Sequence, residues 1–310
     1  TELDGKEATE LASLEKALPA KEASLNDIST RRRDIERYAD AAEGFLQLLE
    51  KSEEQLEIED RSYVIDEGAA VGKIIMRSLA GTDKKMTLEL GGKAANIVFD
   101  DAPIDQAVEG IVNGIFFNQG HVCCAGSRLL VHEPVAAEVL AKLKNRVKVL
   151  RIGDPLDKNT DIGAINSKEQ LGTIERLVVT GVKEGATMFQ PACKLPSKGY
   201  YFRPTIFSGV SMSHRIAREE IFGPVLSVLT FRTLEEAVEK ANNTAYGLSA
   251  GVWTDKGSRI LKMSTELKAG VVWANTYNKF DPASPFGGYK ESGFGREGGR
   301  QGLLDYCKLA

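Results

Sequence analysis

At 310 residues, with 42% apolar and 27% charged residues, the chain has the composition of a soluble globular protein of one or two domains. Its net charge of −4 argues against a nucleic-acid surface, and no apolar run approaches the roughly 20 residues that span a bilayer. Four cysteines without a paired spacing and three scattered histidines argue against a disulfide framework and a metal site, so we expect reduced thiols and a cytoplasmic protein.

Residues 1–62 predict a helical N-terminal segment. Residues 1–60 hold seventeen acidic and eight basic side chains, with little glycine. Apolar residues fall on a seven-residue step that is typical of a helical stripe, namely Leu14, Ile28, Ile35, Ala42, Leu49 and Leu56. Pro19 interrupts the stripe, so we expect a helical hairpin with a longer second helix. It either packs on the next domain or forms a coiled-coil or oligomerisation arm.

The rest of the chain predicts an α/β fold. A helix is predicted over Val64–Ala80 and a strand over Lys85–Leu90. Further strands are predicted at Asn96–Phe99, Arg128–His132, Ala186–Gln190, Tyr201–Phe207, Val225–Phe231, Leu248–Trp253 and Gly270–Asn275. Further helices are predicted at Ile104–Phe117, Val135–Leu150, Ser167–Glu184, Thr233–Asn242 and Lys256–Leu267. This alternation favours a mostly parallel sheet covered by helices on both faces.

Two adjacent cysteines, Cys123 and Cys124, stand between glycines where a predicted helix passes into a predicted strand. Such a junction can hold a reactive thiol against a cleft, although free cysteine more often behaves as a small buried apolar residue. The stretch Leu88–Lys93 places Glu89 between two leucines and before a glycine pair. Apolar surroundings disfavour the charged form of a carboxylate, which suits a general base. A thiol nucleophile with a carboxylate base indicates covalent acyl chemistry.

Four motifs in this order resemble the catalytic half of NAD(P)-dependent aldehyde dehydrogenases. They are Leu88–Lys93, Phe117–Arg128, Glu219–Val225 and Pro285–Gly293. The resemblance extends from about Gly68 to Leu309, and Gly295–Arg300 more weakly resembles the branch called family sixteen. After the helical segment at 1–62, it implies a remnant of a dinucleotide-binding domain at 63–90 and a catalytic domain at 91–310.

The resemblance also implies residue roles. Cys123 matches the nucleophile that attacks the aldehyde carbon, and Glu89 matches the base that activates water to hydrolyse the resulting thioester. Glu220 matches the carboxylate that binds the nicotinamide ribose, with Phe222 packed beside it. Two further residues match positions that line the aldehyde tunnel, Asn275 and Phe280. The implied reaction oxidises a small aldehyde to a carboxylic acid with NAD or NADP, without a metal, a nucleic acid or a membrane.

The sequence departs from the family pattern at the expected cofactor site. The turn that approaches the cofactor pyrophosphate reads Ile65-Asp66-Glu67-Gly68, so two carboxylates compete for a helix start that favours anions. Residues 1–60 show no strand pattern for a cofactor domain. Two alternatives therefore stay open: a truncated or grafted catalytic domain with thiol esterase activity at most, and a non-catalytic scaffold. A homo-oligomer stays open too, but the chain stops at Ala310, before the strand that completes the family's tetramer.

Overall fold

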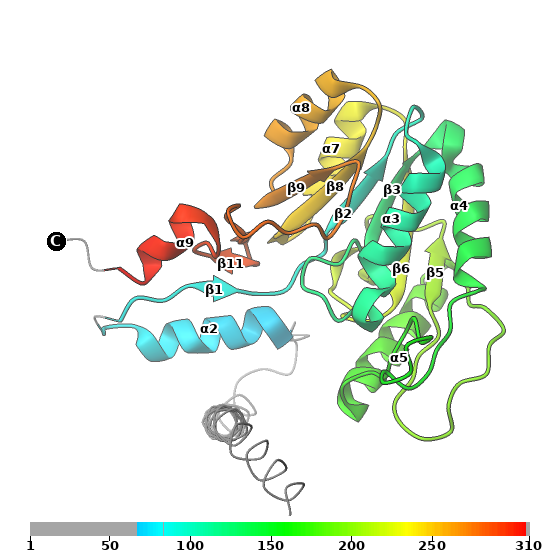
Figure 1. Cartoon of the computed structure of the whole chain (residues 1–310), viewed down its shortest axis with the longest axis horizontal. Coiled ribbons are helices and arrows are strands. Elements are labelled where there is room, and N and C mark those ends of the chain that lie inside the picture. The colour runs from blue at the N-terminus through cyan, green and yellow to red at the C-terminus, as the bar shows by residue number, and fades with distance from the viewer. Residues whose placement is uncertain (1–66, 83, 308–310) are drawn as a thin grey trace, which may run out of the picture. The chain divides into compact units, whose positions relative to one another are not determined.

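A seven-stranded sheet lies at the centre of the computed structural model, which describes residues 67–82 and 84–307 (Figure 1). The strand order is β4-β5-β6-β3-β2-β8-β9, and neighbours are parallel except for the antiparallel edge strand β4. The strands are β2 (Ala95–Val98), β3 (Arg128–His132), β4 (Thr187–Phe189), β5 (Thr205–Ser208), β6 (Val225–Phe231), β8 (Ser249–Trp253) and β9 (Val271–Ala274). The prediction of a mostly parallel sheet is confirmed. The predicted helical hairpin at 1–62 lies outside the described residues.

Helices cover both faces of this sheet. One face carries α3 (Ile104–Phe116) and α4 (Glu133–Val147). The other carries α5 (Lys168–Lys183), α6 (Arg215–Arg218), α7 (Leu234–Asn242) and α8 (Gly257–Glu266). Alternate residues of β2 enter the two cores, since Val98 packs with α3 while Ile97 and Phe99 pack on the other side. Strands buried on both faces read as continuous apolar runs, which is why β6 was predictable to the residue.

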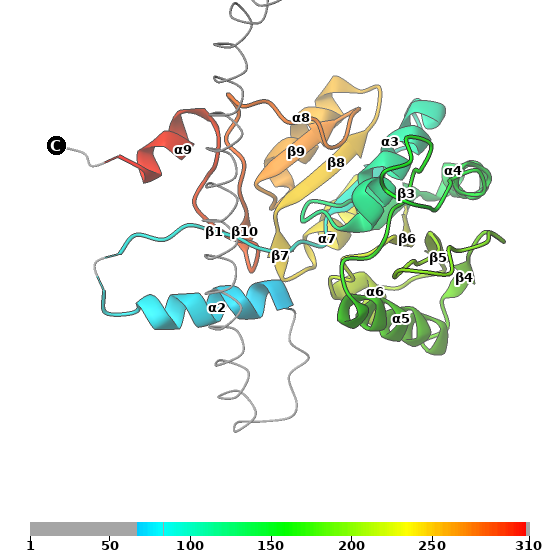
Figure 2. The same cartoon turned by 60° about the horizontal axis from the view of Figure 1, so that its bottom comes forward.

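A smaller layer of short elements lies away from the sheet (Figures 1 and 2). It contains α2 (Glu67–Leu79), β1 (Leu88–Glu89), β7 (Tyr246–Gly247), β10 (Tyr289–Lys290), β11 (Gly293–Phe294) and α9 (Gly299–Asp305). Strand β1 pairs antiparallel with β11, and β10 pairs antiparallel with β7. An ion pair of 2.7 Å between Lys73 Nζ and Glu291 Oε2 ties α2 to the chain between β10 and β11.

One predicted element in this layer is longer than the observed one. The strand predicted at Lys85–Leu90 is only two residues long, Leu88–Glu89, and it pairs with β11. The backbone of the partner explains the short pairing, because Lys290 and Gly295, on either side of β11, have φ of 56° and 91°. Positive φ lies outside the β region and ends regular pairing there, so only Leu88 and Glu89 find partners.

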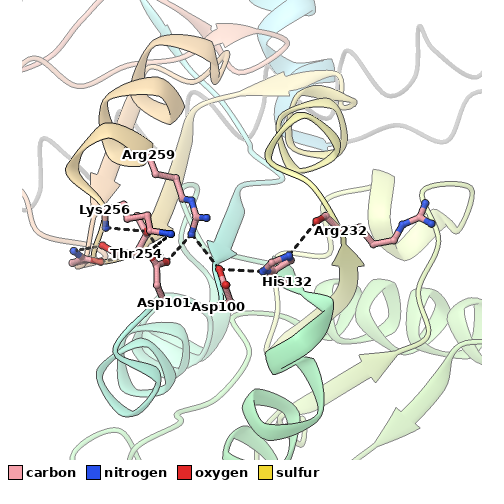
Figure 3. A network of polar contacts seen from close by, with 8 residues as sticks. Asp100, Asp101, His132, Arg232, Thr254, Lys256 and Arg259 are labelled. Atoms are coloured by element: carbon pink, nitrogen blue, oxygen red, sulfur yellow. Dashed lines mark hydrogen bonds and ion pairs between the residues drawn. The ribbon is translucent and has the colours of Figure 1, made fainter.

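The carboxyl-terminal edge of the sheet carries a network of polar contacts (Figure 3). Asp100 and Asp101 follow β2, and Arg259 of α8 contacts both, at 3.2 and 2.7 Å. Thr254, which follows β8, donates its hydroxyl to Asp101 Oδ1 at 2.7 Å. His132, the last residue of β3, places Nδ1 3.2 Å from Asp100 Oδ1. Desolvation would raise the pKa of Asp100, but Arg259, the backbone and His132 outweigh it and hold that pKa below its usual value.

Trp253, at the end of β8, is buried and connects this edge to the core through packing and a hydrogen bond. Its indole Nε1 donates to Asn96 Oδ1 at 2.8 Å, and its side chain is buried. A buried indole N–H needs such a partner. The carboxyl-terminal edge is therefore held by paired polar groups and by a large apolar contact.

Candidate active site

The loop between α3 and β3 carries the cysteine pair. After α3 the chain passes through a 3₁₀ turn, η1 (Phe117–Gly120), in which Asn118, Gln119 and Gly120 have φ of 49°, 47° and 79°. Left-handed backbone at two residues other than glycine is costly and persists only where surrounding contacts enforce it. The junction seen in the sequence is therefore a tightly turned loop that leads to Cys123 and Cys124.

Cys124 is the buried member of the pair and anchors the loop. Its carbonyl accepts hydrogen bonds from the Tyr277 hydroxyl at 2.8 Å and from Ser249 Oγ at 3.2 Å. The Tyr277 ring lies close to Gly251 of β8, and a Cβ on Gly251 would stand 2.6 Å from it, so this position needs glycine. Cys123, one residue earlier, is only half-buried. The loop thus fixes one thiol in the core and presents the other to its surroundings.

The glycine pair that precedes β2 joins Cys123 to a carboxylate. Gly92 N–H donates to Glu220 Oε1 at 2.9 Å. A Cβ on Gly91 would stand 1.8 Å from Glu220 Oε2, and a Cβ on Gly92 would stand 2.5 Å from the Cys123 carbonyl oxygen. Only glycine allows both close approaches. Ser292 completes the junction, since its hydroxyl donates to the Gly91 carbonyl at 2.7 Å.

The four sequence motifs therefore meet at one place, which is the amino-terminal edge of the parallel strands. Gly92 precedes β2, Cys123 precedes β3, and Glu220 precedes β6. Ser292 comes from the fourth motif and also accepts a hydrogen bond from Gly247 N–H at 3.0 Å, which ties β7 to the same junction. Residues far apart in sequence are thus brought within direct hydrogen-bonding contact.

Electrostatics at this junction favour a reactive thiol. The pKa of Cys123 is lowered to about 7, mainly because the side chain of Cys124 donates a hydrogen bond to it, while desolvation and the charge of Glu89 oppose the shift. Desolvation by neighbouring groups and then the charge of Glu297 raise the pKa of Glu89, against the opposing charge of Arg296. The structure thus provides a thiol that ionises near neutral pH and a carboxyl group that holds its proton more tightly than usual.

Phe222 lies at the same edge. Its φ is 49°, its ring is 36% exposed, and the ring centroid stands 5.1 Å from that of His121. Gln170 fixes this turn, because its Nε2 donates to the carbonyls of Ile221 and Phe222 at 2.9 and 3.0 Å. Burial lowers the pKa of His121. The Phe222 ring therefore packs beside His121, a neutral imidazole two residues before Cys123.

The two predicted tunnel residues lie in different settings. Both amide atoms of Asn275 bond to the backbone of Thr254, each at 3.0 Å, so its side chain braces the carboxyl-terminal edge of β8. Phe280 is 59% exposed, and its ring packs edge to face on Trp273 at 5.5 Å and on Phe286 at 5.1 Å. Trp273 in turn donates its Nε1 to the Lys279 carbonyl at 2.8 Å. Phe280 thus belongs to an aromatic wall, and the tunnel roles of both residues stay predictions.

Comparison with known proteins identifies this arrangement. The model of the aldehyde dehydrogenase family matches residues 67–310. The chain belongs to the aldehyde dehydrogenase family. It is 46% identical over 239 residues to an aldehyde dehydrogenase-like protein of Schizosaccharomyces pombe, and 44% identical over 240 residues to human retinal dehydrogenase 2. These matches cover 77% of this chain and 48% and 46% of the relatives, so the chain spans about half the length of the curated relatives it matches.

Solved structures agree with this family assignment. The NAD⁺ complex of an aldehyde dehydrogenase from Bacillus cereus superimposes with a TM-score of 0.75 at 42% identity, over 78% of this chain and 49% of that one. The aldehyde dehydrogenase KauB from Pseudomonas aeruginosa gives a TM-score of 0.76 at 41% identity, over 78% and 50%. The family motifs of this chain therefore sit in the family's own fold.

Some residues of the junction were not predicted as part of the family site. Ser249, Tyr277 and Asn278 contact Cys124 from β8 and from the loop after β9. The sequence offers no signal for Ser249, whereas the run Asn275-Thr276-Tyr277-Asn278, polar residues around one aromatic, marks an irregular loop after a strand. Within residues 67–82 and 84–307, no group of three or more His, Cys, Asp or Glu side chains could hold a metal ion. Across the same residues, no helix combines the length and the apolar character that a membrane crossing requires.

Proposed function

We propose that this chain carries the catalytic machinery of an aldehyde dehydrogenase that oxidises a small aldehyde to a carboxylic acid with NAD or NADP. The observation that carries the proposal is the Gly91–Gly92 junction, which holds the Glu220 carboxylate against one glycine and the Cys123 carbonyl against the other. The charge of a second motif carboxylate, Glu89, also acts on Cys123. Membership of the family supports the same conclusion.

The residues present fit the nicotinamide end of such a cofactor. Glu220 is a part-buried carboxylate, already oriented by the Gly92 N–H, of the kind that accepts hydrogen bonds from ribose hydroxyls. Phe222 offers an exposed ring beside it. Bound NAD or NADP would supply the acceptor for the hydride that leaves the aldehyde carbon. Among the solved relatives, the Bacillus cereus enzyme is an NAD⁺ complex, which supports the same cofactor class.

The chemistry of the chain's own residues follows from their charge states. The Cys123 thiolate attacks the aldehyde carbon, and the carbonyl electron pair moves to the oxygen. After oxidation, the acyl group remains on Cys123 as a thioester. Glu89 removes a proton from water, the resulting hydroxide attacks the thioester, and the carbon–sulfur bond breaks to release the acid and the Cys123 thiolate. A raised pKa suits Glu89 to this role, because a general base works best with a pKa near the working pH.

A second function, NAD-independent hydrolysis of activated esters, is favoured by a specific observation. The charge of Glu89 affects the pKa of Cys123. Nucleophilic attack by Cys123 and activation of water by Glu89 do not require a hydride acceptor. The same two residues would acylate and deacylate with an ester substrate. We further propose that a small aldehyde is the natural substrate and that the chain works in a reducing compartment.

Titration of NAD into the purified chain by calorimetry tests the proposal, with Glu220→Gln as the matched variant. Saturable binding that weakens in Glu220→Gln, together with aldehyde-dependent NADH formation, would support the dehydrogenase. Absence of binding at millimolar NAD, with ester turnover that Cys123→Ala abolishes, would leave the esterase. Absence of both activities would contradict the catalytic proposal and leave a scaffold role.

A further inference from the structure

Cys124 is a buried thiol that the mechanism above does not use. Its Sγ lies 3.4 Å from Asn278 Oδ1, a distance at which the thiol donates a weak hydrogen bond. Cys123 is the preceding residue of the chain, and interaction with the Cys124 side chain lowers the pKa of Cys123, so the Cys123 sulfur is a second candidate acceptor. A thiol has one proton, so the Cys124 proton has two acceptors and can serve only one of them at a time.

The position of this thiol is fixed by its backbone. Two hydroxyls, from Tyr277 and Ser249, hold the Cys124 carbonyl at 2.8 and 3.2 Å. Gly126 N–H, two residues later, donates to the Gly114 carbonyl of α3 at 3.0 Å. The loop therefore leaves rotation about the Cα–Cβ and Cβ–S bonds of Cys124 as the freedom that decides which acceptor receives the proton.

Asn278 provides the acceptor that the Cys124 thiol contacts in this structure. Its φ is 53°, and its side-chain Nδ2 is buried without a hydrogen-bond partner among the described residues. Left-handed backbone and an unpaired buried donor both cost free energy. The contact that the Asn278 amide does make is with Cys124, through Oδ1. A side chain kept at such cost beside the nucleophile points to a role at the site.

We propose that Cys124 and Asn278 form a positioning pair for Cys123, in which the Cys124 thiol proton turns from Asn278 Oδ1 to Cys123 Sγ when Cys123 ionises. The pair rests on the proposed function, since it prepares the nucleophile of that reaction. No bond is made or broken: Cys123 loses its own proton to solvent, and Cys124 keeps its proton while changing its acceptor. Cys124 and Asn278 act through Cys123 rather than on the substrate.

The charges around Cys123 set the size of this effect. A hydrogen bond to a thiolate is charge-assisted and stronger than one to an amide oxygen. The charge of Glu89 opposes ionisation, and the nearby Tyr277 hydroxyl is neutral because burial raises its pKa. Glu220 stands beyond the glycine pair that touches the Cys123 carbonyl. Against these groups, the Cys124 donor is the main cause of the lowered pKa of Cys123.

The pH dependence of Cys123 alkylation by iodoacetamide tests the proposal without any cofactor. Mass spectrometry of the tryptic peptide Ala94–Arg128 locates the label on Cys123 or on Cys124. We expect Cys124→Ala to raise the midpoint of the alkylation curve by about one pH unit, a roughly tenfold loss of thiolate below the midpoint. We expect Cys124→Ser to restore much of it, because serine keeps a donor. Asn278→Leu removes the competing acceptor and lowers the midpoint, whereas Asn278→Asp adds a stronger acceptor and a charge and raises it.

Two controls separate positioning from general disturbance. Ser249→Ala removes a hydrogen bond to the Cys124 carbonyl but leaves the thiol's acceptors in place, so the midpoint should stay. Cys193, a half-buried thiol elsewhere on the chain, provides an internal reference in every variant. Equal midpoints in Cys124→Ala and wild type, or equal shifts in Cys124→Ala and Cys124→Ser, would overturn the pair. Because alkylation requires no NAD, failure here is distinct from failure of NAD binding, and opposite shifts in the two Asn278 variants remain decisive if Cys124→Ala does not fold.

Discussion

The two edges of the central sheet use polar residues in opposite ways. At the carboxyl-terminal edge, Arg259 pairs with both Asp100 and Asp101, and His132 lies against Asp100 (Figure 3). At the amino-terminal edge, glycines let backbone approach backbone, and Cys123 is left half-buried with a lowered pKa. Open α/β sheets commonly bind ligands beyond the carboxyl ends of their strands. In this chain that edge carries internal ion pairs, and the proposed reactive groups lie at the other end.

The difference shows that a candidate site can be located from side chains whose polar groups are not used in structural contacts. The Arg259 guanidinium pairs with two carboxylates and lies 4.3 Å from the centre of the Phe99 ring. The Cys123 thiol forms no ion pair of this kind with any residue that the structure describes. Substitutions at the carboxyl-terminal edge should therefore change stability without changing chemistry, and substitutions at the amino-terminal edge should do the reverse.

Cys123→Ala should have the largest effect. Removal of the nucleophile eliminates the covalent step, so turnover of aldehyde or ester should fall by about 10⁴-fold or more. Thermal unfolding should change little, because the side chain is half-buried and small. Steady-state assays with either substrate, beside a thermal melt, measure both. Cys193→Ala serves as the matched control, and turnover that survives in Cys123→Ala would place the nucleophile elsewhere.

Arg128→Met should have the largest effect on stability and limits the comparison. Arg128 is buried at the start of β3 and donates to the carbonyls of Lys93, Lys240 and Ala241, at 2.8, 2.9 and 2.8 Å. Methionine leaves three buried acceptors without this donor, which should cost about 3–5 kcal/mol of unfolding free energy. Urea denaturation measures the loss, with the exposed Arg151→Met as control. A loss below about 1 kcal/mol would mean that water replaces the guanidinium.

Glu89→Gln tests the base. Thioester hydrolysis should slow by about 10²–10³-fold while the burst of Cys123 acylation remains. In the wild type the pKa of Glu89 is raised, so the active, ionised form disappears as pH falls through a value above the ordinary carboxyl range. Glu297→Gln removes a neighbouring negative charge and should move this acidic limb to lower pH. Pre-steady-state kinetics across pH measure this acidic limb. An acidic limb at the same pH in the wild type and in Glu297→Gln would contradict the assignment.

How much of this was predictable depended on the range of the interactions. The bounds of β3 and β6 followed from continuous apolar runs, and the start of α5 followed from Ser167, whose Oγ accepts from Gln170 N–H at 3.1 Å. Those signals are local. The two-residue length of β1 was not predictable, because it depends on a partner about two hundred residues away.

The site showed the same division. Family motifs pointed to Cys123, Glu89, Glu220 and Phe222. The structure brings Cys123, Glu220 and Phe222 to one edge of the sheet, while Glu89 acts on Cys123 through its charge. Asn275 lies against Thr254 instead, and Asn278 contacts Cys124. These two asparagines stand three positions apart in one loop, and both have positive φ. Sequence could not decide which of them faces the cysteines, because the direction of a side chain in such a loop is set by its tertiary contacts.

Arg259→Ala should have the smallest effect. Its ion pairs are partly exposed, so the loss should be about 1 kcal/mol, with unchanged turnover. The pKa of Asp100 is depressed in the folded chain, so its contribution is present above the unfolded pKa and is lost as pH falls through the folded one. The difference in melting temperature between wild type and Arg259→Ala should therefore shrink in acid. A difference that grows in acid, or a change in turnover, would break the proposed separation of the two edges.

Trp253 and Trp273 are the two tryptophans of the chain, and each belongs to a different region. Trp253 closes β8 beside Asn96, whereas the Trp273 ring lies 4.8 Å from Tyr277 and 5.5 Å from Phe280. The chain thus contains its own pair of fluorophores. With Trp253→Phe, the remaining emission comes from Trp273, and a change on adding an aldehyde would test whether the neighbouring aromatic rings bind substrate. With Trp273→Phe, the remaining emission comes from Trp253 and reports on unfolding of the carboxyl-terminal edge of the sheet. The two variants together allow binding and unfolding to be followed by intrinsic fluorescence, without an added label.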